Sequence, residues 1–281
     1  MRLNSITSKS FFGVLPFRNR GASASYSRFS TALRTYGLSR CSVFQQALLV
    51  GVRPTKGLYS RIKHLPKFTG AVGFMAGPNQ VELISAFLNS PESQRVHHLQ
   101  IGITPAYHAS ENALYGFDMS TVLSLFKGQR LPRLKSLSLG DCYPFGAGST
   151  AAYLRGCALG DITPIFEAAP RLEILDLNGP FCLSRPVRHF KLREINVQID
   201  PVAATEATLS QQSLDHLLAS DLPLIESLSL HCCGSTEMLL DLPRGFDPQR
   251  GMPKLTALSL ENLSRDSARR QAALQARMLA G

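Results

Sequence analysis

Six segments of the chain share one pattern of apolar residues, and this repetition limits the possible folds more than any other feature of the sequence. Each segment reads apolar, any, any, apolar, any, apolar. The last two apolar positions are two residues apart, so both side chains point to one face of a strand. The pattern therefore predicts six short strands that each bury one face, with the first apolar residue in the turn before the strand. The six triplets are Val96, Leu99 and Ile101; Leu134, Leu137 and Leu139; Leu172, Leu175 and Leu177; Leu192, Ile195 and Val197; Ile225, Leu228 and Leu230; and Leu255, Leu258 and Leu260.

A proline precedes four of these segments by two residues, at Pro132, Pro170, Pro223 and Pro253. Proline lacks a backbone N–H and disfavours the helical conformation in the residue before it, so it ends a helix and leads into an extended segment. Helical spacing of apolar residues fills the intervals, at 83–88, 119–126, 162–169 and 214–218. The expected caps of the last three helices are Asp118, Asp161, and Ser210 or Ser213.

Alternating strands and helices predict an α/β protein. A strand, a helix and a further parallel strand connect with a right-handed crossover, and a series of such units stacks into a curved right-handed solenoid with one parallel strand per repeat. The first apolar positions are 38, 38, 20, 33 and 30 residues apart. The 20-residue unit has no room for a full helix, and the long units must carry loops such as residues 142–155 and 202–208.

Three phrases resemble the leucine-rich-repeat superfamily: residues 131–141 (LPRLKSLSLGD), 169–179 (APRLEILDLNG) and 221–230 (DLPLIESLSL). More narrowly they are similar to irregular, ribonuclease-inhibitor-like bacterial proteins without an assigned function. The resemblance covers residues 81–263 and implies an interaction scaffold. The family's Asn or Cys three residues after the last strand leucine is matched only by Cys142 and Cys233. The side-chain ladder of the family is therefore expected to be incomplete.

The basic charge of the chain belongs to its N-terminal part. Residues 1–81 contain 12 Lys and Arg and no Asp or Glu, and residues 82–281 contain 18 basic and 20 acidic residues, so charges of +12 and −2 sum to the net +10. We expect residues 1–80 to form a largely disordered basic arm. It fits an organelle transit peptide, a secretion leader, an upstream extension with Met75 as the true start, or a solvated tail.

The six cysteines lack the spacing of a disulfide framework, which favours a reducing compartment. We expect a cytoplasmic protein, with mitochondrial and secreted locations as alternatives that depend on the arm. The longest apolar run, residues 47–52, is far shorter than the ~20 residues of a membrane-spanning helix. Nucleic-acid binding is expected only through the arm, because residues 82–281 carry no excess of positive charge.

The residue between the last two apolar positions of each strand is expected to project from the concave face of the solenoid. This predicted contact row comprises Gln100, Ser138, Asp176, Asn196, Ser229 and Ser259, with His231 and Glu261 beside it. The row is polar and mildly acidic. It predicts a non-enzymatic scaffold that binds a protein or peptide, with a basic partner slightly favoured. The alternatives are a plain solvated sheet and a secreted effector or ligase-type protein whose repeats select a substrate.

No combination of residues predicts catalysis, a cofactor or a metal. His231, Cys232 and Cys233 are sequence neighbours on a strand and alternate in direction. The Gly-rich residues 146–150 lack the Gly-Lys-Ser/Thr of a phosphate loop. Asp141 and Asp161 each follow a glycine and are interpreted as a turn residue and a helix cap rather than an acid–base pair.

The last segment, residues 264–281, is expected to be a helix that caps the end of the repeat array. Ser264 is its predicted N-cap. The predicted buried face comprises Ala268, Ala272, Ala276 and Leu279.

Overall fold

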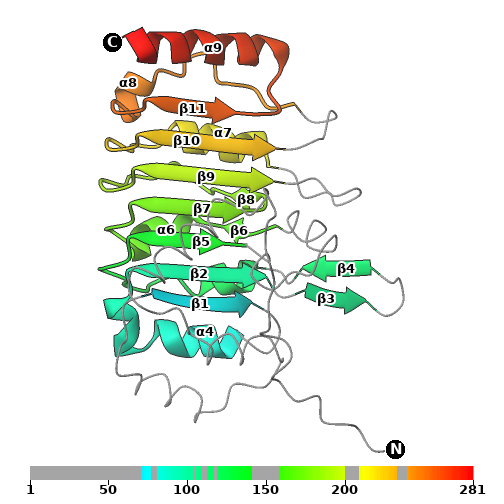
Figure 1. The fold of residues 1–281 in the computed structure, drawn as a ribbon, viewed down its shortest axis with the longest axis vertical. Helices are drawn as coiled ribbons and strands as arrows, with labels where there is room; N and C mark the ends of the chain where they lie inside the picture. Colours follow the sequence, from blue (N-terminus) through cyan, green and yellow to red (C-terminus); the bar gives the residue numbers. More distant parts are fainter. Residues whose placement is uncertain are drawn as a thin grey trace, which may run out of the picture.

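Seven parallel strands form one sheet, and their order in the sheet is their order in the chain. The computed structural model describes residues 71–76, 81–103, 105–108, 113–116, 119–140, 158–199, 209–232 and 239–280. The strands stack one above another in Figure 1. They are β1 (Ala71–Ala76), β2 (His98–Ile103), β5 (Ser136–Leu139), β7 (Ile174–Asn178), β9 (Glu194–Ile199), β10 (Ser227–Cys232) and β11 (Ala257–Leu260). The predicted α/β class, with a parallel sheet, is confirmed.

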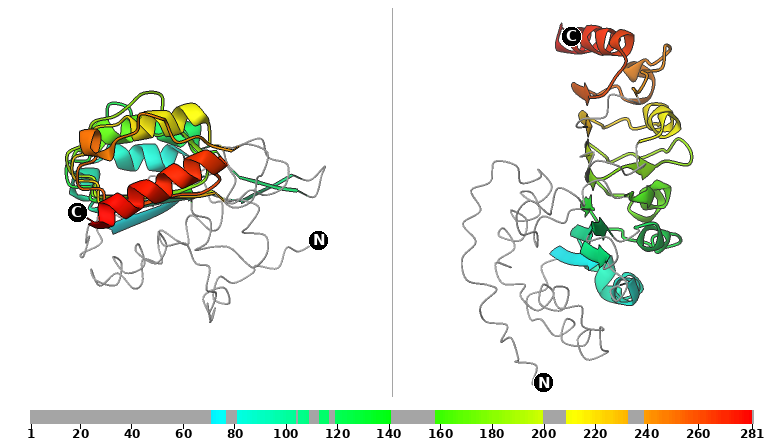
Figure 2. Two further views of the ribbon diagram at one scale, coloured as in Figure 1. Left: turned by 90° about the horizontal axis from the view of Figure 1, so that it is seen from above. Right: turned by 90° about the vertical axis from the view of Figure 1, so that its right-hand side faces the viewer.

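Helices connect most of the successive strands. They are α4 (Val81–Leu88), the 3₁₀ helix η1 (Pro91–Arg95), α5 (Ser120–Ser124), α6 (Thr163–Ala168), α7 (Gln211–Leu218), α8 (Pro248–Gly251) and α9 (Arg265–Ala280). Figure 2 shows that α4, α5, α6 and α7 lie on the same face of the sheet. None of the helices in the described ranges is both long and apolar enough to cross a bilayer.

Two small sheets lie beside the main one. One is an antiparallel pair, β3 (Pro105–His108) and β4 (Ala113–Gly116), inserted between β2 and α5. The other is a parallel pair, β6 (Gly160–Asp161) and β8 (Phe181–Cys182). β8 lies in the 20-residue unit, which is too short for a full helix. The short strand stands where the longer units have a helix.

The recurrent apolar residues fill one interior. Leu137, Leu175, Ile195, Leu228 and Leu258 are neighbours in register from β5 to β11. Every position of the six triplets is at most 5% exposed. The predicted core is therefore confirmed, and each such side chain contributes roughly 1.5–3 kcal/mol by its burial.

The sheet begins earlier than the repeat pattern indicates. β1 pairs with β2 along its whole length, and its Phe74 and Ala76 side chains are buried. Placing the boundary of the basic arm at residue 80 was therefore wrong for residues 71–76, because one buried strand needs only a few alternating apolar residues. Met75 lies within β1, so a chain that began there would lack most of the strand. Residues 1–70 lie outside the described ranges, and the interpretations of the arm stay hypotheses.

The prolines before the strands lie in a turn that recurs from repeat to repeat. In each case the N–H of the first apolar residue donates to the carbonyl three residues earlier, with the proline in the second position of the turn. The donor and acceptor pairs are Leu134 to Leu131 at 3.1 Å, and Leu172 to Ala169, Ile225 to Leu222 and Leu255 to Met252 at 3.0 Å. The same turn thus brings the chain into four of the strands.

His189 takes the role of this turn before Leu192, where the residue two positions earlier is not a proline. Its Nδ1 accepts the N–H of Leu192 at 3.1 Å, and its Nε2 donates to the carbonyl of Ala169 at 2.9 Å. Since Nδ1 accepts, the buried ring is neutral with its proton on Nε2. Burial lowers the pKa of His189, against the opposing effect of the Ala169 carbonyl.

Replacing His189 with alanine is expected to destabilise the fold by roughly 2–4 kcal/mol, because two buried backbone groups lose their partners. The wild type should also lose stability as the pH falls below about 6.5, since the unfolded chain then binds the proton more readily than the folded one. Urea unfolding between pH 8 and pH 5 would measure both effects. The alanine variant should show a shallower pH dependence. The exposed His231, changed to alanine, is the control, and equal losses in the two variants would contradict the role of His189.

Helix α9 covers the edge of the sheet, but not with the face that the sequence predicted. Ala268, Ala272 and Ala276 are exposed. The inward residues include Ser267, which is buried, and Leu274 and Met278, which pack against the core; the side chain of Leu279 lies outside the described residues. The alanine stripe was a wrong prediction because the edge strand presents backbone groups that need polar partners.

Two glutamines of α9 supply those partners. Oε1 of Gln271 accepts the N–H of Leu260 at 3.1 Å, and Nε2 of Gln275 donates to the carbonyl of Leu258. An unpaired strand edge is a template for association with other chains. The glutamine contacts occupy part of this edge along β11.

Candidate functional site

The predicted contact row is one continuous line across the sheet. Register pairs join Gln100 to Ser138, Ser138 to Asp176, and Asp176 to Asn196. They continue from Asn196 to Ser229 and from Ser229 to Ser259. The row lies on the face opposite the buried leucines, because neighbouring residues of a strand point to opposite faces.

The row is buried at one end and accessible at the other. Gln100, Ser138 and Asp176 are at most 4% exposed, whereas Asn196, Ser229 and Ser259 are partly exposed. The expectation that all six project into solvent was therefore wrong for the first three. Alternation along a strand determines the face from which a side chain projects, but not how completely that face is covered. The accessible part of the row runs from β9 to β11.

Side-chain hydrogen bonds connect the middle of the row. Ser229 Oγ donates to Asn196 Oδ1 at 2.8 Å, and Asn196 Nδ2 donates to Asp176 Oδ1 at 2.8 Å. The same amide lies 3.3 Å from Glu194 Oε1. This series of hydrogen bonds orients the Asn196 amide. The Glu194 carboxylate lies beside the amide, in the accessible part of the face.

Two polar atoms at the buried end have no hydrogen-bond partner among the described residues, Gln100 Nε2 and Ser138 Oγ. A buried polar atom without a partner destabilises a fold by about 1–3 kcal/mol. The two residues are register partners, so both atoms belong to one short stretch of the row.

The charge of the face comes from carboxylates. Burial lowers the pKa of His98, and His97 and Lys135 lower it further, so this imidazole is neutral at neutral pH. At the other end His231 Nδ1 lies 3.0 Å from Glu261 Oε1, and both side chains are about half exposed. Among the described residues of this face, Glu194 and Glu261 carry carboxylates that are at least partly exposed, whereas Asp176 is buried.

The other chemically suggestive residues do not form a second site in the described part of the chain. Asp161 Oδ1 accepts the N–H of Thr163 at 3.0 Å and its hydroxyl at 2.6 Å. Burial alone would raise the pKa of Asp161, but hydrogen bonds from Thr163 and Ser184 outweigh it and lower the pKa. Asp161, the predicted N-cap, is the last residue of β6 and lies one residue before the N-cap position, Ile162, but it binds the first residue of α6. Within the described ranges no group of three or more His, Cys, Asp or Glu is placed to hold a metal.

Several predicted features lie outside the described residues. They are Asp118, Asp141, Cys142, residues 146–150, residues 202–208 and Cys233. The side chain of Cys232 is likewise not described.

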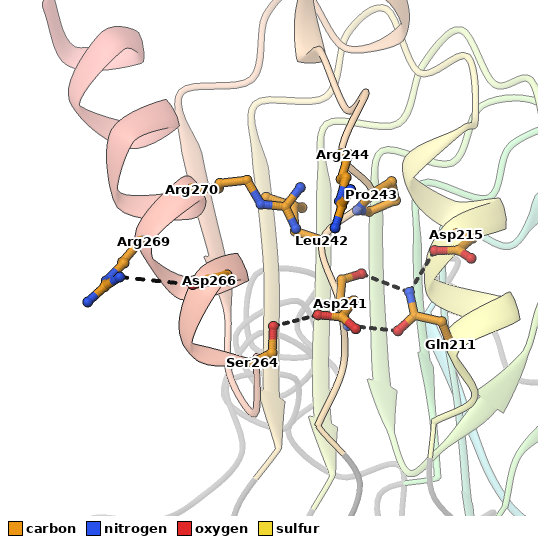
Figure 3. A pocket seen from close by; sticks show the side chains of 10 residues that line it. All are labelled: Gln211, Asp215, Asp241, Leu242, Pro243, Arg244, Ser264, Asp266, Arg269 and Arg270. Atoms are coloured by element: carbon orange, nitrogen blue, oxygen red, sulfur yellow. Dashed lines mark hydrogen bonds and ion pairs between the residues drawn. The ribbon is translucent and has the colours of Figure 1, made fainter.

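A pocket of about 780 Å³ lies away from the contact row, between α7 and α9. The repeat that contains β11 has only the four-residue helix α8, so residues 241–244 form the floor of a gap between the two longer helices. Figure 3 shows Gln211 of α7 bonded to the backbone of Asp241. Both of these hydrogen bonds measure 2.7 Å. No sequence pattern signalled this pocket, because it depends on the size of the gap between two helices.

The side chain of Asp241 lies next to the N-terminal end of α9. Its Oδ1 accepts hydrogen bonds from Ser264 Oγ at 2.5 Å and Ser267 Oγ at 3.0 Å. These hydrogen bonds lower the pKa of Asp241, and the charges of Arg270 and Arg244 lower it further. The carboxylate is therefore ionised and held by the first turn of the helix.

Comparisons with known proteins identify no family. No family model and no curated protein match the chain. A crystal structure of a protein from Bacteroides fragilis is similar over 72% of this chain, with 16% identity and a TM-score of 0.44. The chain spans 54% of the length of that protein.

Proposed function

We propose that the chain is a curved right-handed leucine-rich-repeat solenoid of the irregular, ribonuclease-inhibitor-like type. We propose further that it acts as a non-enzymatic cytoplasmic scaffold and binds a protein or peptide on its polar sheet face. One observation carries the proposal: seven parallel strands follow one another in sheet order and place a continuous row of polar side chains on one face. Helices lie on one face of this sheet, and on its other face the row is accessible to a partner from β9 to β11.

The contact surface is the part of the row from β9 to β11. Asn196, Ser229 and Ser259 are partly exposed there, and His231 and Glu261 are more exposed. The amide and hydroxyl groups suit hydrogen bonds to a peptide backbone or polar side chains. The carboxylates of Glu194 and Glu261 favour a partner with basic residues.

The test replaces Asn196, Ser229 and Ser259 together with arginine in the full chain. Long cationic side chains would block the row and repel a basic partner. Proteins captured from native cells by tagged wild-type and variant chains would be compared by quantitative mass spectrometry. At least one partner is expected to be recovered about tenfold less with the variant.

Gln212→Arg serves as the matched control, because Gln212 is an exposed residue of α7 on the helical face. The control should capture the same proteins as the wild type. Thermal unfolding would show that the triple variant still folds. Recovery of every partner by the folded triple variant would exclude this surface.

A further inference from the structure

We propose that the pocket between α7 and α9 binds a phosphate monoester through the guanidinium groups of Arg244 and Arg270. This site lies on the helical side of the fold, so it is independent of the sheet-face function proposed above.

The two arginines have unused hydrogen-bond donors. Arg270 Nη2 donates to Ser267 Oγ at 3.0 Å, but its Nη1 is buried and has no partner among the described residues. Arg244 has no carboxylate within 4.0 Å in the described part of the chain. Figure 3 shows both side chains extending into the same part of the pocket, from α9 and from the floor.

The carboxylates of the pocket are already engaged. Asp266 forms an ion pair with Arg269 at 3.9 Å. Asp241 is held by Ser264 and Ser267, and Asp215 accepts from Gln211 Nε2 at 2.7 Å. The three arginines and three aspartates of the lining balance in formal charge, and Arg244 and Arg270 are the two of these arginines that form no ion pair within 4.0 Å among the described residues. Their guanidinium groups therefore keep N–H donors that a phosphate could accept from.

The ligand class follows from the donors and the volume. The planar fork of a guanidinium pairs with two oxygens of a phosphate, and two such groups can bind one tetrahedral anion from different sides. A volume of about 780 Å³ exceeds what one phosphate fills, and Leu242 and Pro243 line it with apolar surface. The pocket therefore suits a phosphate that carries an organic group, either a free metabolite or a phosphorylated side chain.

Isothermal titration of the full chain tests the proposal, with O-phosphoserine, a phosphoserine peptide and inorganic phosphate as probes. O-phosphoserine is expected to bind with a dissociation constant on the order of 1 mM. Tighter binding of the peptide would identify a phosphorylated protein as the source, and equal binding of the peptide and the amino acid would identify a small molecule. Arg244→Gln and Arg270→Gln should each weaken binding about tenfold, since each removes a charge-assisted contact.

Arg265→Gln is the matched control, because Arg265 is an exposed residue of the same helix that does not line the pocket. It should leave the affinity unchanged. Arg270→Gln also removes the bond to Ser267, so Arg244→Gln decides the outcome if that variant unfolds. The absence of saturable binding by the wild type, or equal affinity in Arg244→Gln, would overturn the proposal.

Discussion

Replacing Gly140 with alanine is expected to lower the free energy of unfolding by roughly 2–5 kcal/mol, from backbone strain and overpacking together. Gly140 follows β5 with a φ of +79°, a conformation that side chains with a Cβ rarely adopt. A Cβ added there would collide with the carbonyl oxygen of Asn178 and would lie 2.6 Å from Leu159 Cδ2. The collision is with the backbone of the neighbouring repeat, so it cannot be relieved by a rotamer change. Urea unfolding followed by circular dichroism would measure the loss.

Gly128 provides the matched control. Its φ is +77°, nearly that of Gly140, but a Cβ would meet no atom within 4 Å. Gly128→Ala should therefore lose only the backbone contribution, about 1 kcal/mol. The difference between the two losses in unfolding free energy measures the contribution of the close contact between Gly140 and the backbone of Asn178. Equal losses would show that the repeats do not approach as closely as the structure places them.

The apolar pattern was sufficient to predict six of the seven strands of the main sheet. Val96 and its five counterparts are buried because a side chain at the same place in each repeat meets the same neighbours. The prolines were informative for a similar reason, since each one favours the same turn by fixing its own φ. A sequence pattern that occurs several times predicts structure well, because each copy supports the assignment of the others.

Features that occur once could not be predicted in this way. His189 forms its turn through contacts with Ala169 and Leu192, and the first of these lies in another repeat. Gln271 and Gln275 act on the backbone of β11, which only the assembled sheet brings next to α9. The alanine face of this helix was predicted from apolar residues at helical spacing. The polar contacts depend on a partner that helical periodicity does not describe.

The candidate sites show the same contrast between features that recur along the sequence and features that occur once. Alternation along each strand identified the row from Gln100 to Ser259 and its order, because the period of two determines the face. It did not predict that Gln100, Ser138 and Asp176 are buried. The exposure of a side chain depends on which other parts of the folded chain cover the sheet face. The arginine pocket gave no signal, because Arg244 and Arg270 come together only through the short helix α8 and the packing of α9.

Replacing Leu137 and Leu175 with alanine is expected to reveal energetic coupling between neighbouring strands of the main sheet. Both side chains are fully buried and are register partners in β5 and β7. Each single variant should lose about 2–5 kcal/mol through the lost contacts and the cavity that remains. The double variant should depart from the sum by roughly 0.5–3 kcal/mol, because the two cavities share the same lining.

The control is the pair Leu137→Ala and Leu258→Ala, which removes two equally buried leucines four strands apart, roughly 19 Å at the usual strand spacing. Their losses should add to within about 0.5 kcal/mol, since no side chain contacts both. Urea unfolding of the five variants, with the slope of each transition compared, would give the coupling energies. Strong coupling in the distant pair, or additivity in the adjacent pair, would contradict the sheet order, in which β5 lies next to β7 and far from β11.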